Sequence, residues 1–247
     1  MKEIAYDHEK NLHTREGPMC ALDILFDEKR PSSLLDIGCG TGAWLRAAQD
    51  LGVSDILGVD GVDVPDELLL IPRSKVCHHD LTLPLNLGRR FDVVFCFEVA
   101  EHLDHADANT LIESLVSHAD VIYFSAACPG QPGQHHVNCQ WPEYWQSIFN
   151  RCGYVCTDAP RWRIWQSDSI EPWYRQNMIV ATKESSGAGK EGRIPGVVHP
   201  AMFEFFRNSH RLEQVDEIAR GMMPSRWYLK TLVTTAAAKL RRKIMAN

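Results

Sequence analysis

The chain has 247 residues, of which 45% are hydrophobic and 23% are charged, and its formal net charge is −6. This length allows one large domain, or one domain with an appendage, and the composition excludes collagen-like, mucin-like and wholly disordered proteins. No run of about 18 apolar residues lacks a charge, and Met1-Lys2-Glu3 opens a polar segment. We therefore expect a cytoplasmic protein without a transmembrane segment or a signal peptide.

The charge is unevenly distributed along the chain. Residues 199–247 contain nine Lys or Arg and four Asp or Glu, a net charge of +5 that leaves −11 on the rest. The acidic body argues against nucleic acid as the main partner, whereas the basic end is compatible with a phosphate-bearing partner or a membrane surface. The eight cysteines are scattered singly, with no Cys-x-x-Cys pair, so we expect reduced thiols and no structural zinc site.

From about Ser33 to Thr182, short apolar runs alternate with amphipathic stretches, a pattern typical of β-α units around a mostly parallel sheet. Strands are predicted at Leu34–Ile37, Ile56–Asp60, Lys75–His78, Asp92–Phe97, Val121–Ser125, Tyr154–Thr157 and Asn177–Thr182. Helices are predicted at Gly17–Glu28, Ala43–Leu51, Ala106–His118 and Pro142–Cys152. Residues 158–175 look like a loop, so we expect the last two strands to form an antiparallel pair at one edge.

The sequence predicts three segments along the chain. Residues 1–183 form one α/β domain, 184–196 a flexible linker rich in small and charged residues, and 197–247 a helical extension. The extension is predicted to contain helices at Pro200–Arg220 and Trp227–Met245, through which the chain could form a homodimer. The second helix ends in Lys239, Arg241, Arg242 and Lys243, a run that also suits the negative end of a helix dipole.

A glycine turn follows the first predicted strand, in the segment Leu34–Gly42. Glycines let a ligand approach the backbone, and the helix that follows offers N–H groups to negative atoms. Asp36 precedes the turn, and Asp60 lies about twenty residues after it, where an acid can accept hydrogen bonds from ribose hydroxyls. Asp80 comes after the third strand. These features leave NAD open as a ligand.

The segment Leu34–Gly42, Asp60, Asp80 and the run Phe91–Leu103 together resemble four motifs of the class I S-adenosylmethionine (SAM) dependent methyltransferases. The resemblance covers roughly Ser33–Thr182. It implies a Rossmann-like, doubly wound, seven-stranded sheet with a last antiparallel strand. It also implies that SAM is the cofactor, that S-adenosylhomocysteine is the product, and that the cofactor contacts Asp36, Gly38, Cys39, Gly40, Gly42, Asp60, Gly61, Asp80, Leu81, Phe97 and Glu98.

Histidines stand where the acceptor of the methyl group must lie, after the fourth and fifth strands. They are His102 and the pair His135-His136. An imidazole can take the proton of an acceptor hydroxyl, and we expect His136 to be this base. The alternative role of each histidine is to order a loop by hydrogen bonding.

A metal ion is a further possibility at this place. Glu98, Glu101 and His102 lie within five residues, and His136 would return from the next loop to complete a divalent-ion site. The arrangement resembles that of metal-dependent small-RNA 2′-O-methyltransferases and, in part, that of ubiquinone-biosynthesis O-methyltransferases. The same run is also widespread in metal-free relatives, so the sequence favours a site without a metal.

Five of the seven tryptophans lie between Trp141 and Trp173. Trp145 follows Trp141 at helical spacing, which favours buried helix packing, but aromatic faces near polar groups also suit a sugar. Together with His136-Val137-Asn138 and Trp173–Asn177, they resemble a methyltransferase subgroup that acts on glycans. The first hypothesis is a SAM-dependent methyltransferase acting on a hydroxyl of a sugar, a glycan or a similar small molecule. The alternatives are a metal-assisted RNA 2′-O-methyltransferase and a catalytically silent SAM-binding partner subunit.

Overall fold

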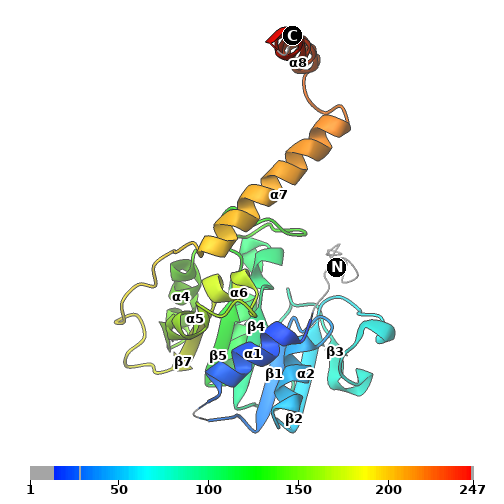
Figure 1. The fold of residues 1–247 in the computed structure, drawn as a ribbon. Coiled ribbons are helices and arrows are strands. Elements are labelled where there is room, and N and C mark those ends of the chain that lie inside the picture. Colours follow the sequence, from blue (N-terminus) through cyan, green and yellow to red (C-terminus); the bar gives the residue numbers. More distant parts are fainter. Residues whose placement is uncertain (1–13, 28, 246–247) are drawn as a thin grey trace. The chain divides into compact units, whose positions relative to one another are not determined.

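The computed structural model describes residues 14–27 and 29–245, apart from some side chains of the last two helices (Figure 1). Two predicted features fall outside the described residues: the end of the first predicted helix at Glu28 and the polar start of the chain at Met1–Glu3. The last predicted helix ends at Met245, which is the final described residue. Two compact units make up the chain, residues 1–202 and 203–247. Among the described residues, no helix is long and apolar enough to cross a membrane.

A seven-stranded sheet forms the centre of the first unit, with the order β3-β2-β1-β4-β5-β7-β6. The strands are β1 (Ser33–Ile37), β2 (Asp55–Asp60), β3 (Val76–His78), β4 (Val93–Phe97), β5 (Val121–Ser125), β6 (Tyr154–Thr157) and β7 (Ile179–Lys183). Neighbouring strands from β3 to β5 are parallel, and β7 runs antiparallel to both β5 and β6. The predicted α/β fold with a last antiparallel strand is therefore confirmed.

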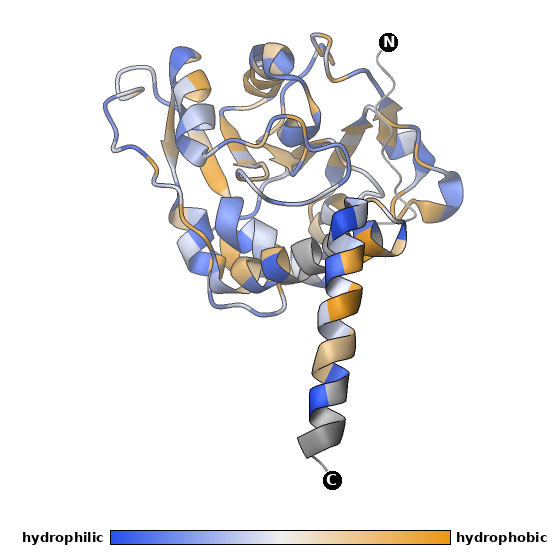
Figure 2. Ribbon diagram, turned by 90° about the horizontal axis from the view of Figure 1, so that it is seen from above, coloured by the Kyte–Doolittle hydropathy of each residue, from blue (hydrophilic) through white to orange (hydrophobic). Residues whose placement is uncertain are grey.

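Helices cover both faces of this sheet, because alternate residues of the inner strands are apolar on each side. Leu35 and Val94 face one core with α3 (Ala108–His118) and α4 (Pro142–Arg151). Leu34 and Phe95 face the other core with α1 (Glu16–Leu25) and α2 (Ala43–Asp50). Figure 2 shows hydrophobic colours on the strands between these helices.

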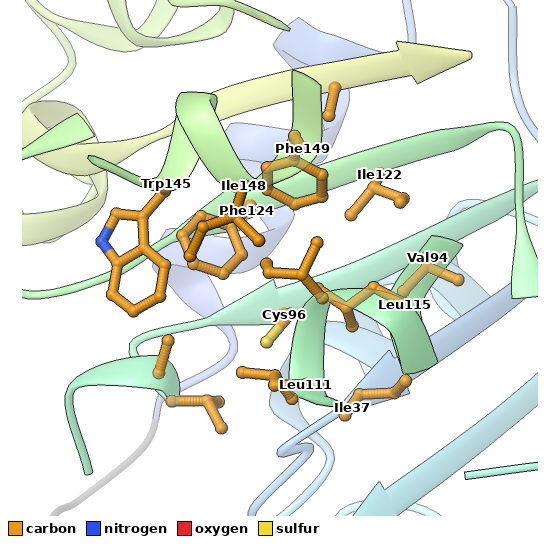
Figure 3. Close-up of a cluster of buried hydrophobic side chains, with 14 of the residues drawn as sticks. Ile37, Val94, Cys96, Leu111, Leu115, Ile122, Phe124, Trp145, Ile148 and Phe149 are labelled. Carbon is orange, nitrogen blue, oxygen red and sulfur yellow. The ribbon is translucent and has the colours of Figure 1, made fainter. Parts of the chain in front are cut away.

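The first core also explains one tryptophan of the aromatic segment. Trp145 of α4 is 1% exposed, and its ring lies 5.3 Å from that of Phe124 on β5, which also packs against Phe149 (Figure 3). On the other face, Trp44 of α2 packs against Phe97 with 4.5 Å between ring centroids. Both tryptophans thus belong to the packed interior.

The segment between β6 and β7 differs from the predicted loop. It contains two short helices, α5 (Ala159–Ile164) and α6 (Pro172–Asn177), each with a proline in its first turn. Six residues are too few for an apolar period to emerge from the sequence, which is why the pattern gave no helix here. Because α6 takes up Asn177, strand β7 begins two residues later than predicted.

The segment 184–196 also differs from the expected flexible linker, because it packs on the first unit. The Glu191 carboxylate accepts hydrogen bonds from Gln146 at 3.0 Å and Asn150 at 2.6 Å, and Ile194 is 4% exposed within the first core. The linker was predicted from the small and charged residues of this segment, and amino-acid composition does not predict individual hydrogen bonds or apolar contacts.

The division between the two units falls after Met202. This point lies in the first turn of α7 (Pro200–Ala219), and α8 (Ser225–Met245) follows; both helices are close to the predicted bounds. The described residues also contain four short 3-10 helices: η2 (Asp66–Leu68), η3 (Arg73–Lys75), η4 (Ala100–His102) and η5 (His105–Asp107).

Candidate functional site

The candidate site lies where the carboxyl ends of β1, β2, β4 and β5 meet, the edge at which open α/β sheets bind ligands. Strands β1 and β4 are neighbours in the sheet, so the loops that follow them are side by side. We name the loop after β1 together with the end of β2 the cofactor side (residues 36–42 and 60–62). The loops after β4 and β5 form the acceptor side (residues 98–102 and 128–140).

The glycine turn of the cofactor side has a left-handed backbone at three of its glycines. Gly38, Gly40 and Gly42 have φ angles of 80°, 51° and 80°. A Cβ atom on Gly38 would lie 2.2 Å from a methyl carbon of Val99, so this glycine lets the two sides pack together. Gly42 forms the N-terminal cap of α2, whose first N–H groups therefore face the site.

Asp60 holds the glycine turn in place from the end of β2. Its carboxylate accepts hydrogen bonds from the Gly40 N–H at 2.7 Å and from the Val62 N–H at 2.8 Å. A carboxylate has about four acceptor positions, so two protein donors leave capacity for ribose hydroxyls. This acid thus fits the ribose role and also has a structural one.

Asp36, the second acid of this side, is 2% exposed at the end of β1. Burial, and then the charge of Asp60, raise the pKa of Asp36 to about 8. Two adjacent buried acids favour a ligand with hydrogen-bond donors or positive charge, such as a sulfonium with its amino group. They disfavour a pyrophosphate, so the residues fit SAM better than NAD.

The other predicted cofactor contacts have more varied surroundings. Cys39 is buried, and burial raises the pKa of its thiol. Asp80 accepts hydrogen bonds from the backbone N–H and the hydroxyl of Thr82, which lower its pKa and close a turn. Gly61 lies near Leu81, whereas Phe97 is part of the aromatic core beside Trp44. Contacts of all these residues with a cofactor stay predictions.

Glu98 is the centre of a buried polar network on the acceptor side. Its carboxylate accepts hydrogen bonds from the side-chain amides of Gln131 at 2.7 Å and Asn177 at 3.2 Å. The Asn177 amide also donates to Gln131 at 3.0 Å. Burial still raises the pKa of Glu98, and its φ of 53° is in the left-handed region that non-glycine residues rarely adopt.

Glu101 lies in η4 and is completely buried. Neither of its carboxylate oxygens has a hydrogen bond of ordinary length and angle among the described residues, although the Glu98 carboxyl group and the Ala127 backbone lie close to it. Burial and the neighbouring Glu98 charge raise its pKa well above the ordinary value. Its backbone oxygen, by contrast, accepts the N–H groups of Val137 and Asn138 at 2.9 and 3.0 Å, which ties the loop after β5 to η4.

This tie brings His102 and His136 together, with 5.1 Å between their ring centroids. Burial lowers the pKa of both, that of His102 to about 4, so both imidazoles are neutral at pH 7. His135, by contrast, is exposed and has a φ of 50°. The rings of His102 and His136 therefore lie together on the acceptor side, with the exposed His135 next to them in the chain, and the catalytic role of all three histidines stays a prediction.

Gln131 and Asn177 were not singled out from the sequence as site residues. They lie 33 and 79 positions away from Glu98 along the chain, and no local pattern links them. Asn177 does end the Trp173–Asn177 segment that was noted for its resemblance to glycan methyltransferases, which was the one available signal.

Comparisons with known proteins identify the family of this chain. Residues 12–157 match the family model Methyltransf_23, described as a methyltransferase domain. A dTDP-3-amino-3,6-dideoxy-alpha-D-glucopyranose N,N-dimethyltransferase of Streptomyces fradiae is 32% identical over 116 residues, which are 44% of this chain and 43% of that protein. The secondary metabolism regulator laeA of Coprinopsis cinerea is 35% identical over 102 residues, 37% of this chain and 25% of that protein.

The matched segments thus span less than half of the length of either curated relative. Among solved structures, the sugar N-methyltransferase KedS8 from a Streptoalloteichus species has a TM-score of 0.51 at 16% identity. The match covers 74% of this chain and 89% of KedS8, and it shows a shared fold.

Proposed function

We propose that this chain, which belongs to the class I SAM-dependent methyltransferases, transfers a methyl group to a hydroxyl of a sugar or a similar small molecule. One observation carries the proposal. The imidazoles of His102 and His136 lie together with the buried Glu101, beside a glycine turn that suits the cofactor. A hydroxyl must lose its proton when it is methylated, and this cluster offers groups for that purpose.

The cofactor side is proposed to bind SAM, which supplies an electrophilic methyl group on a sulfonium. Asp60 would accept hydrogen bonds from the ribose, and Asp36 would face positive charge or a donor group. The N–H groups at the start of α2 would meet a negative group of the ligand. The contact of Gly38 with Val99 keeps this side close to the acceptor side.

The acceptor side is proposed to orient the hydroxyl and receive its proton. Val137 and Asn138 are fixed on η4 by two backbone hydrogen bonds, so the loop places His136 with little freedom. Such fixed placement is worth much of the rate in a displacement between two bound reactants. Gln131 and Asn177 donate hydrogen bonds to Glu98 and are proposed as positioning residues.

Calorimetric titration and a turnover assay test the proposal. Full-length protein should bind SAM and S-adenosylhomocysteine but not NAD. It should then produce S-adenosylhomocysteine with at least one member of a panel of sugar nucleotides, glycans, phenols and short RNAs. Turnover with RNA alone would support the RNA 2′-O-methyltransferase alternative, and SAM binding without turnover would support a silent partner subunit.

Methylation of an amino sugar is a second candidate, favoured by the 32% identity to an amino-sugar N,N-dimethyltransferase. A neutral amine can accept a methyl group before it loses a proton, so it depends less on the histidines. Matched sugar nucleotides with a hydroxyl or an amino group at one position distinguish the two candidates. The hydroxyl proposal expects faster turnover of the hydroxyl sugar and a strong effect of the His136→Ala variant on it.

A further inference from the structure

Three potential metal ligands converge on the acceptor side. Within the described part of the chain, Glu101, His102 and His136 each offer one ligand atom, and these atoms all lie within 4.8 Å of one another. Two elements bring them together, η4 and the loop after β5. The hydrogen bonds from the Val137 and Asn138 N–H groups to the Glu101 oxygen hold those elements in register.

The surroundings of the Glu101 carboxylate indicate that a ligand binds next to it. Glu101 is 0% exposed, and neither of its carboxylate oxygens has a hydrogen bond of ordinary length and angle in the described residues. A buried carboxyl group without hydrogen-bond partners is costly in either protonation state, and a bound cation would stabilise its ionised form. Glu98, three residues earlier, shows the contrast, because Gln131 and Asn177 donate to its oxygens.

The imidazole of His136 is oriented as a ligand requires. Its Nδ1–H donates to the backbone oxygen of Gln131 at 2.9 Å, and this tautomer leaves the lone pair on Nε2. A Cβ atom on residue 133 would lie 2.1 Å from Nε2, so only a glycine leaves room beside this atom. His102 Nδ1 similarly lies 3.4 Å from the backbone oxygen of His135.

We infer that Glu101, His102 and His136 bind one divalent ion of the first transition series at the acceptor side. Two imidazole nitrogens and one carboxylate oxygen suit zinc, cobalt, manganese or iron, whereas magnesium and calcium prefer oxygen ligands alone. Neighbouring ligands of such an ion are about 3–3.5 Å apart, so closure around it requires side-chain shifts of about 1 Å. Glu98, a candidate ligand by sequence, is instead held by amide groups.

Three protein ligands leave coordination positions open for another molecule. An acceptor bound on this side could occupy such a position, and a bound cation lowers the pKa of a hydroxyl that coordinates it. This last step rests on the proposed function, whereas the metal site itself rests on the three residues alone.

Cobalt titration of tag-free, EDTA-treated full-length protein tests the site. We expect visible absorption bands from one tightly bound Co²⁺ ion per chain, with the stoichiometry confirmed by calorimetry. Glu101→Gln and His136→Asn should each weaken this binding on the order of 100-fold or more, since loss of even an outer-shell partner costs 10–100-fold.

Two further variants separate the site from general effects. His135→Asn changes the exposed neighbour on the same loop and should bind Co²⁺ like the wild type. Gly133→Ala removes no ligand but displaces the His136 ring, so it should weaken Co²⁺ binding. SAM affinity measured for every variant reports whether the first unit is folded.

The site is overturned if wild-type protein fails to bind Co²⁺, Mn²⁺ and Zn²⁺ at millimolar concentrations, or if Glu101→Gln binds Co²⁺ as tightly as the wild type. Ion binding without methylation of any hydroxyl would keep the site and reject the proposed acceptor. Methylation that continues at full rate after complete chelation would reject the ion's role at the acceptor and leave the proposed function intact.

Discussion

The cofactor side and the acceptor side adjoin at one edge of the sheet, but different kinds of chemical groups form them. The cofactor side is made mainly of backbone, with glycines at positive φ and an acid that accepts two N–H groups. The acceptor side is made of side chains from distant parts of the chain, and two of its non-glycine residues, Glu98 and His135, have left-handed backbones.

The two sides also differ in how far their polar groups are satisfied. Asp60 has hydrogen-bond donors on both oxygens, whereas the described residues offer the Glu101 carboxylate no hydrogen bond of ordinary length and angle. Unsatisfied buried groups and strained backbone cost folding energy and persist where a ligand or a reaction uses them. The difference teaches that the chain itself supplies hydrogen-bond donors to the acid of the cofactor side, whereas the acceptor side leaves a buried acid for which we infer a bound ion.

Replacing His136 by alanine should have the largest effect and should be confined to the acceptor side. We expect turnover to fall by about 10²–10⁴-fold, the usual contribution of a group that handles a proton in the transition state. Affinity for SAM, measured by calorimetry, should stay near the wild-type value. A variant with full turnover would reduce the loop to scaffolding and would move the catalytic role to His102.

Replacing Asp60 by alanine should damage the cofactor side instead. The change removes charged hydrogen bonds, each worth about 1.5–3 kcal/mol, so we expect SAM affinity to fall on the order of 100-fold. Calorimetry would measure this loss, with Asp63→Ala as a control at an exposed position in the next loop. Tight NAD binding with no response to SAM would contradict the assignment of this side.

Gly38→Ala tests the contact between the two sides. It should destabilise the protein by about 2–4 kcal/mol, because a left-handed φ costs about 1–2 kcal/mol and overpacking against Val99 adds about 1–3 kcal/mol. Denaturant unfolding would measure the loss. Gly130→Ala has a similar φ of 86° with no atom near the added Cβ, so it should show the backbone cost alone.

A second change in the Gly38→Ala background separates the two costs. Val99→Ala removes the methyl carbons that the new Cβ would meet, so the double variant should recover the overpacking part of the loss. If the double variant is no more stable than the sum of the single effects, the two sides do not pack as described.

The pH dependence of stability should reveal Asp36. Its folded pKa of about 8 is raised above the unfolded value of about 3.9, so the folded state holds more protons between these pH values. Stability should therefore fall as pH rises from about 4 to 8, by on the order of 1 kcal/mol per pH unit. Thermal unfolding at several pH values should show a shallower slope for Asp36→Asn.

The slope of the Asp36→Asn variant should not vanish. Burial also raises the pKa values of Glu98 and Glu101, and these groups contribute with the same sign. An unchanged slope in the variant would show that Asp36 is ionised in the folded protein at neutral pH.

The sequence by itself determined the fold and the cofactor side. Strand and helix periods reflect burial on the two faces of a sheet, and they located every strand to within about two residues. The glycine turn and its acids lie within a short stretch of chain, so the spacing of these residues in the sequence was enough to predict a cofactor site. Local patterns did not predict helices α5 and α6 or the packing of the segment 184–196. The two helices are too short for an apolar period, and the composition of the segment gives no periodic signal.

Only the tertiary structure decided how the acceptor side is assembled. The sequence showed that Glu101 and His102 are adjacent, but the position of His136 depends on hydrogen bonds between η4 and a loop some 35 residues further on. Gln131 and Asn177 reach Glu98 from still other elements. Side chains that meet through long-range packing leave no spacing in the sequence, because the distance between them is set by the fold and not by the number of residues that separate them.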